Sequence, residues 1–250
     1  MISKVIHYCW FGRNPLPESE LKCINSWKKF FPDYEIKEWN EDNFDVNIIP
    51  YTREAYEAKK YAFVSDYARF WVLYREGGLY FDTDVEVIKP MDDILEKGGF
   101  MGVEVPAVDN SILPIINPGL GLGIDAGNAL CAELLDSYKS FKFRKEDGTL
   151  NEKTVCSYTT ELLIEHGLKA TNSIQTIENI NIYPKEYFNP LDDNTGILKI
   201  TENTRSVHWY SKTWIKPRPV RKWIVQRLHR LFGVDFFGSV KKRFLNKIWN

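Results

Sequence analysis

The N-terminal part of the chain has the hydrophobic pattern of a strand, a helix and a second strand. Residues 4–10 are rich in β-forming side chains and residues 34–39 alternate apolar with polar positions, so both are predicted strands. Between them, Leu21, Ile24 and Trp27 recur at helical spacing within residues 17–30, which predicts a helix with one buried face. Two strands joined through a helix indicate a parallel pair and an α/β fold.

Two adjacent helices are predicted next, a charged one over residues 51–60 and a longer one over residues 61–76. Gly77-Gly78 is expected to end the longer helix as a left-handed cap. Aromatic side chains recur along this helix and are expected to be core: Tyr61, Phe63, Tyr67, Phe70 and Tyr74.

The remaining pattern is less regular. It predicts strands at residues 79–81, 85–88, 100–105, 181–183 and 197–200, helices at 126–141 and 157–166, and a strand or loop at 206–214. Residues 112–126 contain three spaced glycines, and Gly121-x-Gly123-x-x-Ala126 matches the dinucleotide pattern in letters only, because a matching strand-end acid is missing. We expect a tight glycine turn near a substrate there, with Asn117 as a candidate acceptor-binding residue.

Composition and charge separate a body from a tail. The chain has 250 residues, 44% of them hydrophobic, which is enough for one large core. Residues 216–250 hold ten Lys/Arg and one acid, whereas residues 1–215 hold 23 basic and 33 acidic side chains. We therefore expect a domain at 1–215 and a basic amphipathic tail at 216–250 that binds an anionic membrane surface. The alternative is an ordinary C-terminal helix packed on the body, while nucleic-acid binding is disfavoured because no known module accompanies the charge.

Cellular location is predicted from what the sequence lacks. The four cysteines form no CxxC pair, which favours reduced thiols in a cytoplasm over disulfide or zinc frameworks. The N-terminus has no apolar stretch of signal-peptide length, and no stretch approaches a membrane span. The expected location is therefore cytoplasmic, peripheral on the inner face of the membrane.

Residues 61–86 carry the candidate chemistry. Asp82 and Asp84 follow a predicted strand, and in an extended chain they share a face. Paired carboxylates suit Mg²⁺ or Mn²⁺ and, through the metal, a diphosphate, although an acidic turn is the alternative. Asp66 and Arg69 lie three residues apart on one helix face, where the guanidinium can hold hydroxyl or carboxylate groups; a purely structural ion pair is the alternative.

The segment SDYARFWVLYREGGLYFDTDVEV resembles the family 32 glycosyltransferases, whose hallmark is Ser-Asp-x-x-Arg, a Gly-Gly turn and Tyr-x-Asp-x-Asp. Further similar pieces are IHYCWFG at residue 6, NSWKKFFPDYEIKEWN at residue 25 and HWYSKTW at residue 208. That family includes capsular polysaccharide transferases, yeast-type initiating mannosyltransferases and relatives of glucosylating toxin domains. The resemblance implies a GT-A fold, with one Rossmann-like mixed sheet flanked by helices and a metal site at its centre.

The resemblance also implies roles for individual residues. Trp10 would stack the nucleobase, Asp66 and Arg69 would hold ribose and sugar hydroxyls, and Tyr80 would line the nucleotide pocket. A metal, Mn²⁺ or Mg²⁺, would be held by Asp82, Asp84 and His208, and the diphosphate would be closed over by Lys212 and Trp214. The last segment departs from the family pattern, because Trp209 follows His208 directly. Read without the family, Trp10 could equally be core and His208 structural.

Taken together, the sequence predicts a metal-dependent retaining glycosyltransferase. Its donor would be a nucleotide sugar, with a UDP-sugar preferred, and its acceptor a lipid-linked saccharide in capsular or surface polysaccharide synthesis. One alternative is a metal-dependent nucleotidyltransferase or sugar-nucleotide hydrolase, which also uses paired aspartates. The other is a non-catalytic membrane-associated adaptor, which would bind no donor.

Overall fold

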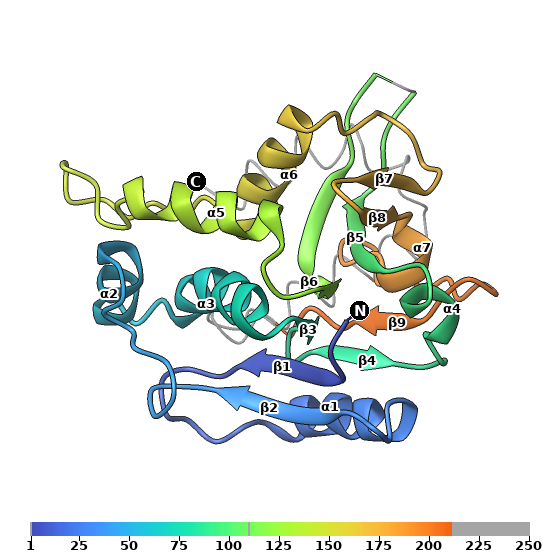
Figure 1. Ribbon diagram of the computed structural model, residues 1–250, viewed down its shortest axis with the longest axis horizontal. Helices are drawn as coiled ribbons and strands as arrows, with labels where there is room; N and C mark the ends of the chain where they lie inside the picture. The colour runs from blue at the N-terminus through green and yellow to red at the C-terminus, as the bar shows by residue number, and fades with distance from the viewer. Residues whose placement is uncertain (1, 110, 212–250) are drawn as a thin grey trace, which may run out of the picture.

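The structure is a computed structural model and describes residues 2–109 and 111–211. One large mixed sheet has the strand order β2-β1-β3-β6-β5-β8-β7, and a small second sheet pairs β4 with β9 (Figure 1). The strands of the large sheet are β1 (Val5–Cys9), β2 (Glu35–Trp39), β3 (Gly78–Tyr80), β5 (Gly99–Val105), β6 (Ile115–Ile124), β7 (Gln175–Ile177) and β8 (Ile180–Tyr183). The small sheet contains β4 (Val85–Val87) and β9 (Ser206–His208).

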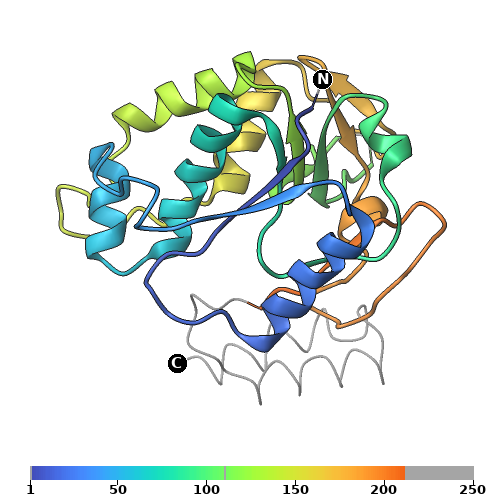
Figure 2. The ribbon, with the colours of Figure 1, turned by 60° about the horizontal axis from the view of Figure 1, so that its bottom comes forward.

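The helices cover both faces of the large sheet. Those longer than one turn are α1 (Glu18–Phe30), α2 (Pro50–Glu57), α3 (Tyr61–Glu76), α5 (Ala129–Ser140) and α6 (Val155–Glu165), and the short ones are α4 (Asp92–Leu95) and α7 (Lys185–Phe188). Helix α1 lies across the sheet from α3, α5 and α6 (Figure 2). No helix in the described ranges combines the length and apolarity that crossing a membrane requires.

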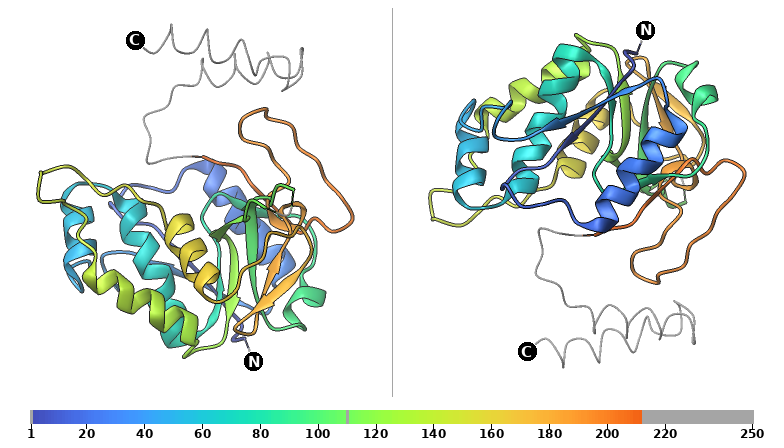
Figure 3. Two further views of the ribbon diagram at one scale, coloured as in Figure 1. Left: turned by 90° about the horizontal axis from the view of Figure 1, so that it is seen from above. Right: turned by 90° about the horizontal axis from the view of Figure 1, so that it is seen from below.

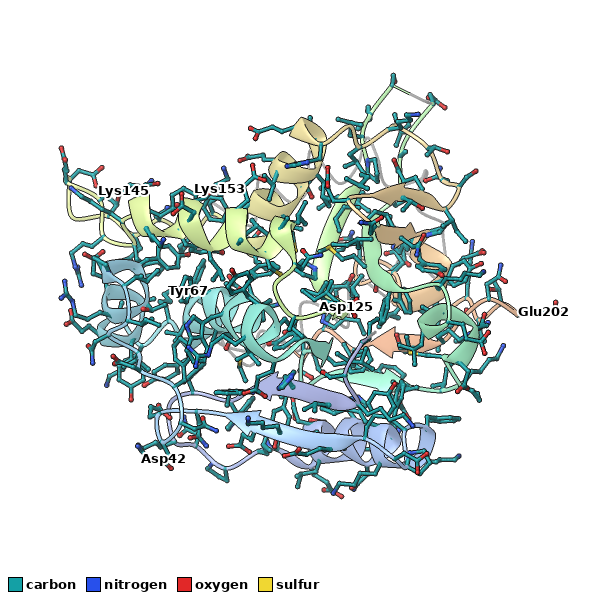
Figure 4. The ribbon with its side chains drawn as sticks, viewed as in Figure 1. Asp42, Tyr67, Asp125, Lys145, Lys153 and Glu202 are labelled. Atoms are coloured by element: carbon teal, nitrogen blue, oxygen red, sulfur yellow. The ribbon has the colours of Figure 1, made fainter. Side chains whose placement is uncertain are left out.

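Helix α3 forms where the sequence predicts it and packs along the middle of the sheet. Phe63, Tyr67 and Phe70 are buried as expected, and Tyr67 points between α3 and α5, where its ring contacts that of Tyr138 (Figure 4). Tyr61 is partly buried. Tyr74, in contrast, is exposed.

The end of α3 is tied to the first two strands. Gly77 has the positive φ expected of a helix stop, although its ψ of −165° differs from the left-handed cap predicted. Its carbonyl accepts a hydrogen bond from His7 Nε2, and His7 Nδ1 accepts one from the Trp39 indole N–H. The two bonds require the neutral Nε2–H tautomer, and burial lowers the pKa of His7 accordingly. This buried chain joins β1, β2 and the helix end.

The predicted parallel pairing of β1 with β2 is confirmed, and β3 extends it in parallel on the other side of β1. The carboxyl ends of these three strands therefore meet at one edge of the sheet. The predicted α/β fold with a mixed sheet flanked by helices is confirmed. Its GT-A type stays a prediction, and the predicted helical tail lies outside the described residues.

Two predicted local structures are wrong. The glycine-rich segment is the ten-residue strand β6 and not a tight turn. Its glycines admit neighbouring aromatic rings, because a Cβ on Gly123 would lie 2.3 Å from the Phe100 ring. The same finding excludes a dinucleotide-binding loop there. The strand predicted at 197–200 does not form either, because this loop between α7 and β9 projects from the body (Figure 3) and makes only one isolated bridge, Leu191 with Leu198.

Candidate active site

A cavity opens at the carboxyl ends of β1 and β2. Its volume is about 390 Å³, and its lining residues are Trp10, Arg13, Asn14, Pro15, Glu38, Asn40 and Glu41. The Trp10 indole is partly buried and fixed by a hydrogen bond that its Nε1–H donates to the Asn14 carbonyl oxygen at 2.6 Å. Trp10 is thus neither a core residue nor freely mobile. Trp10 lines the cavity, and its role as a nucleobase partner stays a prediction.

Gly12 and Glu41 shape the wall of this cavity. The Gly12 N–H donates to Glu41 Oε1 at 2.7 Å, and the Tyr56 hydroxyl donates to the same oxygen at 2.9 Å. Gly12 has φ +96° and a Cβ there would lie 2.4 Å from the Tyr61 ring, so only glycine fits. Glu41 Oε2 is buried without a hydrogen-bond partner. The cavity is therefore lined by an aromatic side chain and by Glu41, whose Oε2 has almost no exposed surface.

Arg69 lies at the centre of the site and is 3% exposed. One guanidinium nitrogen donates to Asp66 Oδ1 at 2.9 Å, and the other lies 3.3 Å from Asp82 Oδ1, within ion-pair distance but without hydrogen-bond geometry. The Tyr80 ring supports the guanidinium at 4.8 Å. Burial alone would lower the pKa of Arg69, but Asp82, Tyr80 and Asp66 raise it, so the group stays a fixed cation between two carboxylates.

Asp66 is the inner carboxylate of this arrangement. Burial raises its pKa to about 7, although the Arg69 guanidinium opposes that rise. The predicted i, i+3 neighbours on α3 are therefore confirmed as a buried ion pair. Burial, with a smaller effect of the neighbouring Asp82 carboxylate, leaves Asp66 close to protonation at neutral pH.

Asp82 and Asp84 do not alternate along an extended chain. The Val85 N–H donates to the Asp82 carbonyl oxygen, so the two acids lie in a turn between β3 and β4. Asp82 Oδ1 accepts a hydrogen bond from the Tyr80 hydroxyl at 3.1 Å, on the Arg69 side. The Asp84 carboxylate instead pairs with His208. The expectation of a shared face from strand alternation is therefore corrected, because the turn places each carboxylate separately.

His208 and Asp84 form a second buried pair, joined across β9 and the β3–β4 turn. His208 Nε2 lies 3.2 Å from Asp84 Oδ1, and the Ser211 N–H donates to Asp84 Oδ2 at 2.8 Å. Burial alone would lower the pKa of His208, but the Asp84 carboxylate raises it. Burial would likewise raise the pKa of Asp84, yet His208 and the Ser211 N–H lower it. Both shifts indicate a charged pair.

Of the three predicted metal ligands, Asp84 and His208 form an ion pair with each other, whereas Asp82 lies beside Arg69. Within residues 2–109 and 111–211, no group of three or more His, Cys, Asp or Glu side chains is arranged to hold a metal. The donor chemistry of two carboxylates and one imidazole nevertheless suits Mn²⁺ or Mg²⁺. The 3.2 Å between Asp84 Oδ1 and His208 Nε2 is the distance of their ion pair, so a bound cation would replace that contact. The residues fit a divalent cation, with Asp84 and His208 paired with each other here.

Strand β6 closes the site from the other side through a bulge. Its register with β5 jumps from Met101–Leu122 to Gly102–Asn117, so residues 118–121 leave the ladder. The Gly119 carbonyl oxygen accepts a hydrogen bond from the Asp82 N–H, and a Cβ on Gly119 would lie 1.8 Å from Asp82 Oδ2. The bulge therefore brings backbone against the catalytic candidate Asp82, which only a glycine allows.

The structure places the other predicted residues as follows. Tyr80 is almost fully buried beneath Arg69 and does not line the cavity beside Trp10. Asn117 is buried in β6; its side-chain oxygen accepts from the Gly119 N–H at 2.7 Å and its amide donates to Glu104 at 3.4 Å. Lys212, Trp214 and the tail 216–250 lie outside the described residues.

Glu104 was not predicted, because no local pattern marks a single acid in a strand.

Residues 17–100 match the protein family described as "Glycosyltransferase sugar-binding region containing DXD motif". Asp82-Thr83-Asp84 is the Asp-x-Asp of that segment. The match covers the whole of α3 and the turn after β3, where the buried ion pairs lie. It therefore supports glycosyl transfer as the chemistry of this site.

Curated relatives share the same part of the chain. Inositol phosphoceramide mannosyltransferase 1 of Schizosaccharomyces pombe is 32% identical over 111 residues, covering 40% of this chain and 33% of that protein. Inositol phosphoceramide mannosyltransferase 3 of the same organism is 27% identical over 117 residues, covering 45% of this chain and 33% of that protein. The matched region thus spans about a third of the length of these relatives.

Among solved structures, the PaToxG glycosyltransferase is 22% identical, with 66% of this chain and 69% of that chain covered and a TM-score of 0.47.

Proposed function

We propose that this chain is a metal-dependent, retaining glycosyltransferase that moves a hexosyl group from a nucleotide sugar to a saccharide acceptor. The observation that carries the proposal is Arg69, a buried cation held between Asp66 and Asp82 beside the Asp84–His208 pair. This arrangement lies at the carboxyl edge of parallel strands, where α/β sheets bind ligands. It also lies in the segment that matches a DXD glycosyltransferase family.

The donor would lie across the ends of β1 and β3. Its base would occupy the cavity beside Trp10, and its diphosphate would reach towards Asp82 and Asp84. Glu41 lines the cavity, and its buried Oε2, which has no partner, would suit a base with a ring N–H, as uracil has, if side chains shifted on binding. We therefore prefer a UDP-sugar, as the family resemblance also implies. Guanine carries a ring N–H too, so GDP-sugars belong in the test.

Asp82, Asp84 and His208 are the residues that would hold Mn²⁺ or Mg²⁺. When bound, such an ion would neutralise charge on the leaving nucleoside diphosphate. Arg69 provides a fixed positive charge without any reorganisation, because its two carboxylates and the Tyr80 ring already hold it. Lys212 and Trp214 are proposed to close over the diphosphate.

The residues of this chain would position the transferred sugar. The atoms that form and break bonds all belong to the two substrates. Asp66 accepts hydrogen bonds from sugar or ribose hydroxyls, and Arg69 donates to them. The acceptor oxygen attacks the anomeric carbon as the bond to the diphosphate oxygen breaks. The electron pair leaves with the diphosphate, which also takes the hydroxyl proton. Attack on the same face as departure retains the configuration, and it needs no covalent nucleophile from the protein.

A lipid-linked acceptor and attachment to the inner membrane surface complete the proposal. The names of the curated relatives state that those proteins transfer mannose to inositol phosphoceramide, which is a lipid. The basic tail 216–250 would bring the enzyme to an anionic surface carrying such an acceptor. Capsular or surface polysaccharide synthesis is the role we infer for the product.

One experiment tests the chemistry. Purified full-length protein is incubated with UDP-glucose, UDP-galactose, UDP-N-acetylglucosamine and GDP-mannose, each with Mn²⁺ or with EDTA, and the products are separated. Release of free nucleoside diphosphate and sugar that requires Mn²⁺ supports the proposal. Release of nucleoside monophosphate and sugar phosphate indicates a sugar-nucleotide hydrolase. Release of pyrophosphate in a parallel incubation with UTP or GTP and a sugar 1-phosphate indicates a nucleotidyltransferase. Absence of both turnover and donor binding indicates an adaptor.

A further inference from the structure

Glu104 is placed at the site by a second bulge, which lies in β5. Val103 pairs with Ile116 and Val105 pairs with Ile115, so Glu104 is an extra residue in β5 opposite a single step of β6. A bulge of this kind turns a side chain out of the regular alternation, and bulges are frequent beside active sites. Regular pairing of β5 with β6 is therefore interrupted at the position of Glu104.

The surroundings of Glu104 leave much of its hydrogen-bonding capacity unused. Its carboxylate accepts from the Asn117 amide at 3.4 Å and from the Tyr210 hydroxyl at 3.5 Å, both long contacts to neutral donors. It also faces the Cys156 thiol, whose pKa is raised by burial and, to a smaller extent, by this carboxylate. The ion pairs of this site in the described ranges join Arg69 to two aspartates and His208 to Asp84, and none includes Glu104. A partly exposed carboxylate without a cation partner remains a strong acceptor for ligand hydroxyls.

Glu104 is also linked to the proposed metal ligands through intervening residues. Asn117 accepts from the Gly119 N–H, and the Gly119 carbonyl accepts from the Asp82 N–H. On the other side, the Tyr210 ring lies 4.1 Å from the His208 ring. Glu104 therefore belongs to the β5–β6 side of the site, whereas the donor-holding residues Asp66 and Arg69 belong to α3.

We propose that Glu104, together with Asn117, binds the acceptor saccharide by accepting hydrogen bonds from its hydroxyl groups. This inference rests on the proposed function and adds the acceptor side of the same site. Carboxylate and amide side by side offer two acceptors and a donor, which is the pattern that neighbouring sugar hydroxyls require. Glu104 takes no proton in the reaction, because the leaving diphosphate takes it; its role is to hold the acceptor at the reacting carbon.

The test compares Glu104→Gln with wild type and with the control Glu202→Gln. Glu202 lies at the tip of the projecting loop, at the edge of the molecule (Figure 4). Each protein receives the donor that wild type hydrolyses fastest in the screen above, in water, in molar glycerol, or with methyl α- and β-glycosides of glucose, galactose and mannose. Free sugar and glycosylated polyol are quantified separately, together with the KM for donor and the kcat of hydrolysis.

We expect Glu104→Gln to transfer to polyols with about tenfold lower kcat/KM, as loss of a charged acceptor predicts, while donor KM and hydrolysis stay within about twofold. Glu104→Asp should recover part of the transfer, and Glu202→Gln should equal wild type. The inference is overturned if the ratio of transfer to hydrolysis is unchanged in Glu104→Gln, if wild type transfers to none of these polyols, or if donor hydrolysis falls in parallel. Failure of wild type to hydrolyse any donor would instead overturn the proposed function.

Discussion

Individual side chains in this site carry more than one interaction each, and Arg69 is the clearest case. It contacts Asp66, lies within ion-pair distance of Asp82 and stacks on Tyr80, all while 3% exposed. A lysine ammonium cannot make the two directed contacts at once. Replacing Arg69 is therefore expected to change both donor turnover and stability, and the two effects differ enough in size to be measured separately.

We predict that Arg69→Lys lowers donor turnover by about 100-fold or more, the size typical of losing one preorganised donor. Stability should fall by only about 1–2 kcal/mol, because the cation remains and Asp66 can take up a proton. Arg75→Lys, on the same helix over the Trp71 ring, is the matched control. Turnover kinetics and urea unfolding distinguish the two effects; a variant that loses stability alone would make Arg69 a structural ion pair.

Asp84 gives a second prediction at the residue scale. Asp84→Asn keeps an oxygen for the Ser211 N–H but removes the charge that faces His208. We expect Mn²⁺-dependent donor turnover to fall by at least about 100-fold, with far-UV circular dichroism unchanged. Thr83→Ala in the same turn should retain activity. Wild-type turnover by folded Asp84→Asn would refute the metal assignment.

At the scale of elements, the bulges in β5 and β6 bring Glu104 and the Gly119 backbone to the site. Gly119 is the tightest point, since a Cβ there would overlap Asp82 Oδ2. We predict that Gly119→Ala displaces Asp82 and lowers turnover by about tenfold or more, as small misplacements of a catalytic group do. Gly98→Ala, at φ +90° in open space, should cost stability without touching the site. Equal turnover in the two variants would show that the bulge does not position Asp82.

A surface histidine joins three elements and should make stability depend on pH. His166 at the end of α6 contacts Glu133 of α5 at 2.9 Å and Glu178, between β7 and β8, at 3.1 Å. The two glutamates raise the pKa of His166 despite the small opposing effect of burial. A raised folded-state pKa means that the contribution is complete below the unfolded value and is lost as pH rises through the folded value.

We therefore predict that His166→Gln lowers the free energy of unfolding at about pH 6 by less than about 1 kcal/mol, because the pair is partly exposed. At about pH 9 the variant and wild type should have equal stability. Glu161→Gln on the same helix removes an ion pair with Lys153 that involves no histidine, and its effect should be the same at both pH values. A His166→Gln effect that is constant with pH would show that the charge is irrelevant.

At the scale of the whole molecule, the acidic body and the basic tail suggest two separable tasks. We predict that removing residues 216–250 abolishes sedimentation with phosphatidylserine vesicles and leaves donor hydrolysis within about twofold, because each basic group contributes on the order of 1 kcal/mol at an anionic surface. Binding by the full chain should weaken steeply with salt. Equal vesicle binding by both proteins would remove the tail as anchor, and lost hydrolysis would show that the tail packs on the body.

The sequence by itself determined the local features of this protein. The bounds of α3, the helix stop at Gly77, the parallel strands β1 and β2 and the Asp66–Arg69 neighbours all depend on residues close together in the chain. Helical spacing and strand alternation report such neighbours directly, because 3.6- and 2-residue periods place side chains on common faces.

Only the tertiary structure decided which distant groups meet. It joined Arg69 to Asp82, set Gly119 against Asp82, paired Asp84 with His208 and turned Glu104 towards Asn117. It also made a buried strand of a segment whose glycines suggested a turn. These outcomes depend on sheet order and on bulges, in which one residue more or less changes where a side chain points. No period in the chain encodes that choice, because it is settled by packing between segments far apart in the sequence.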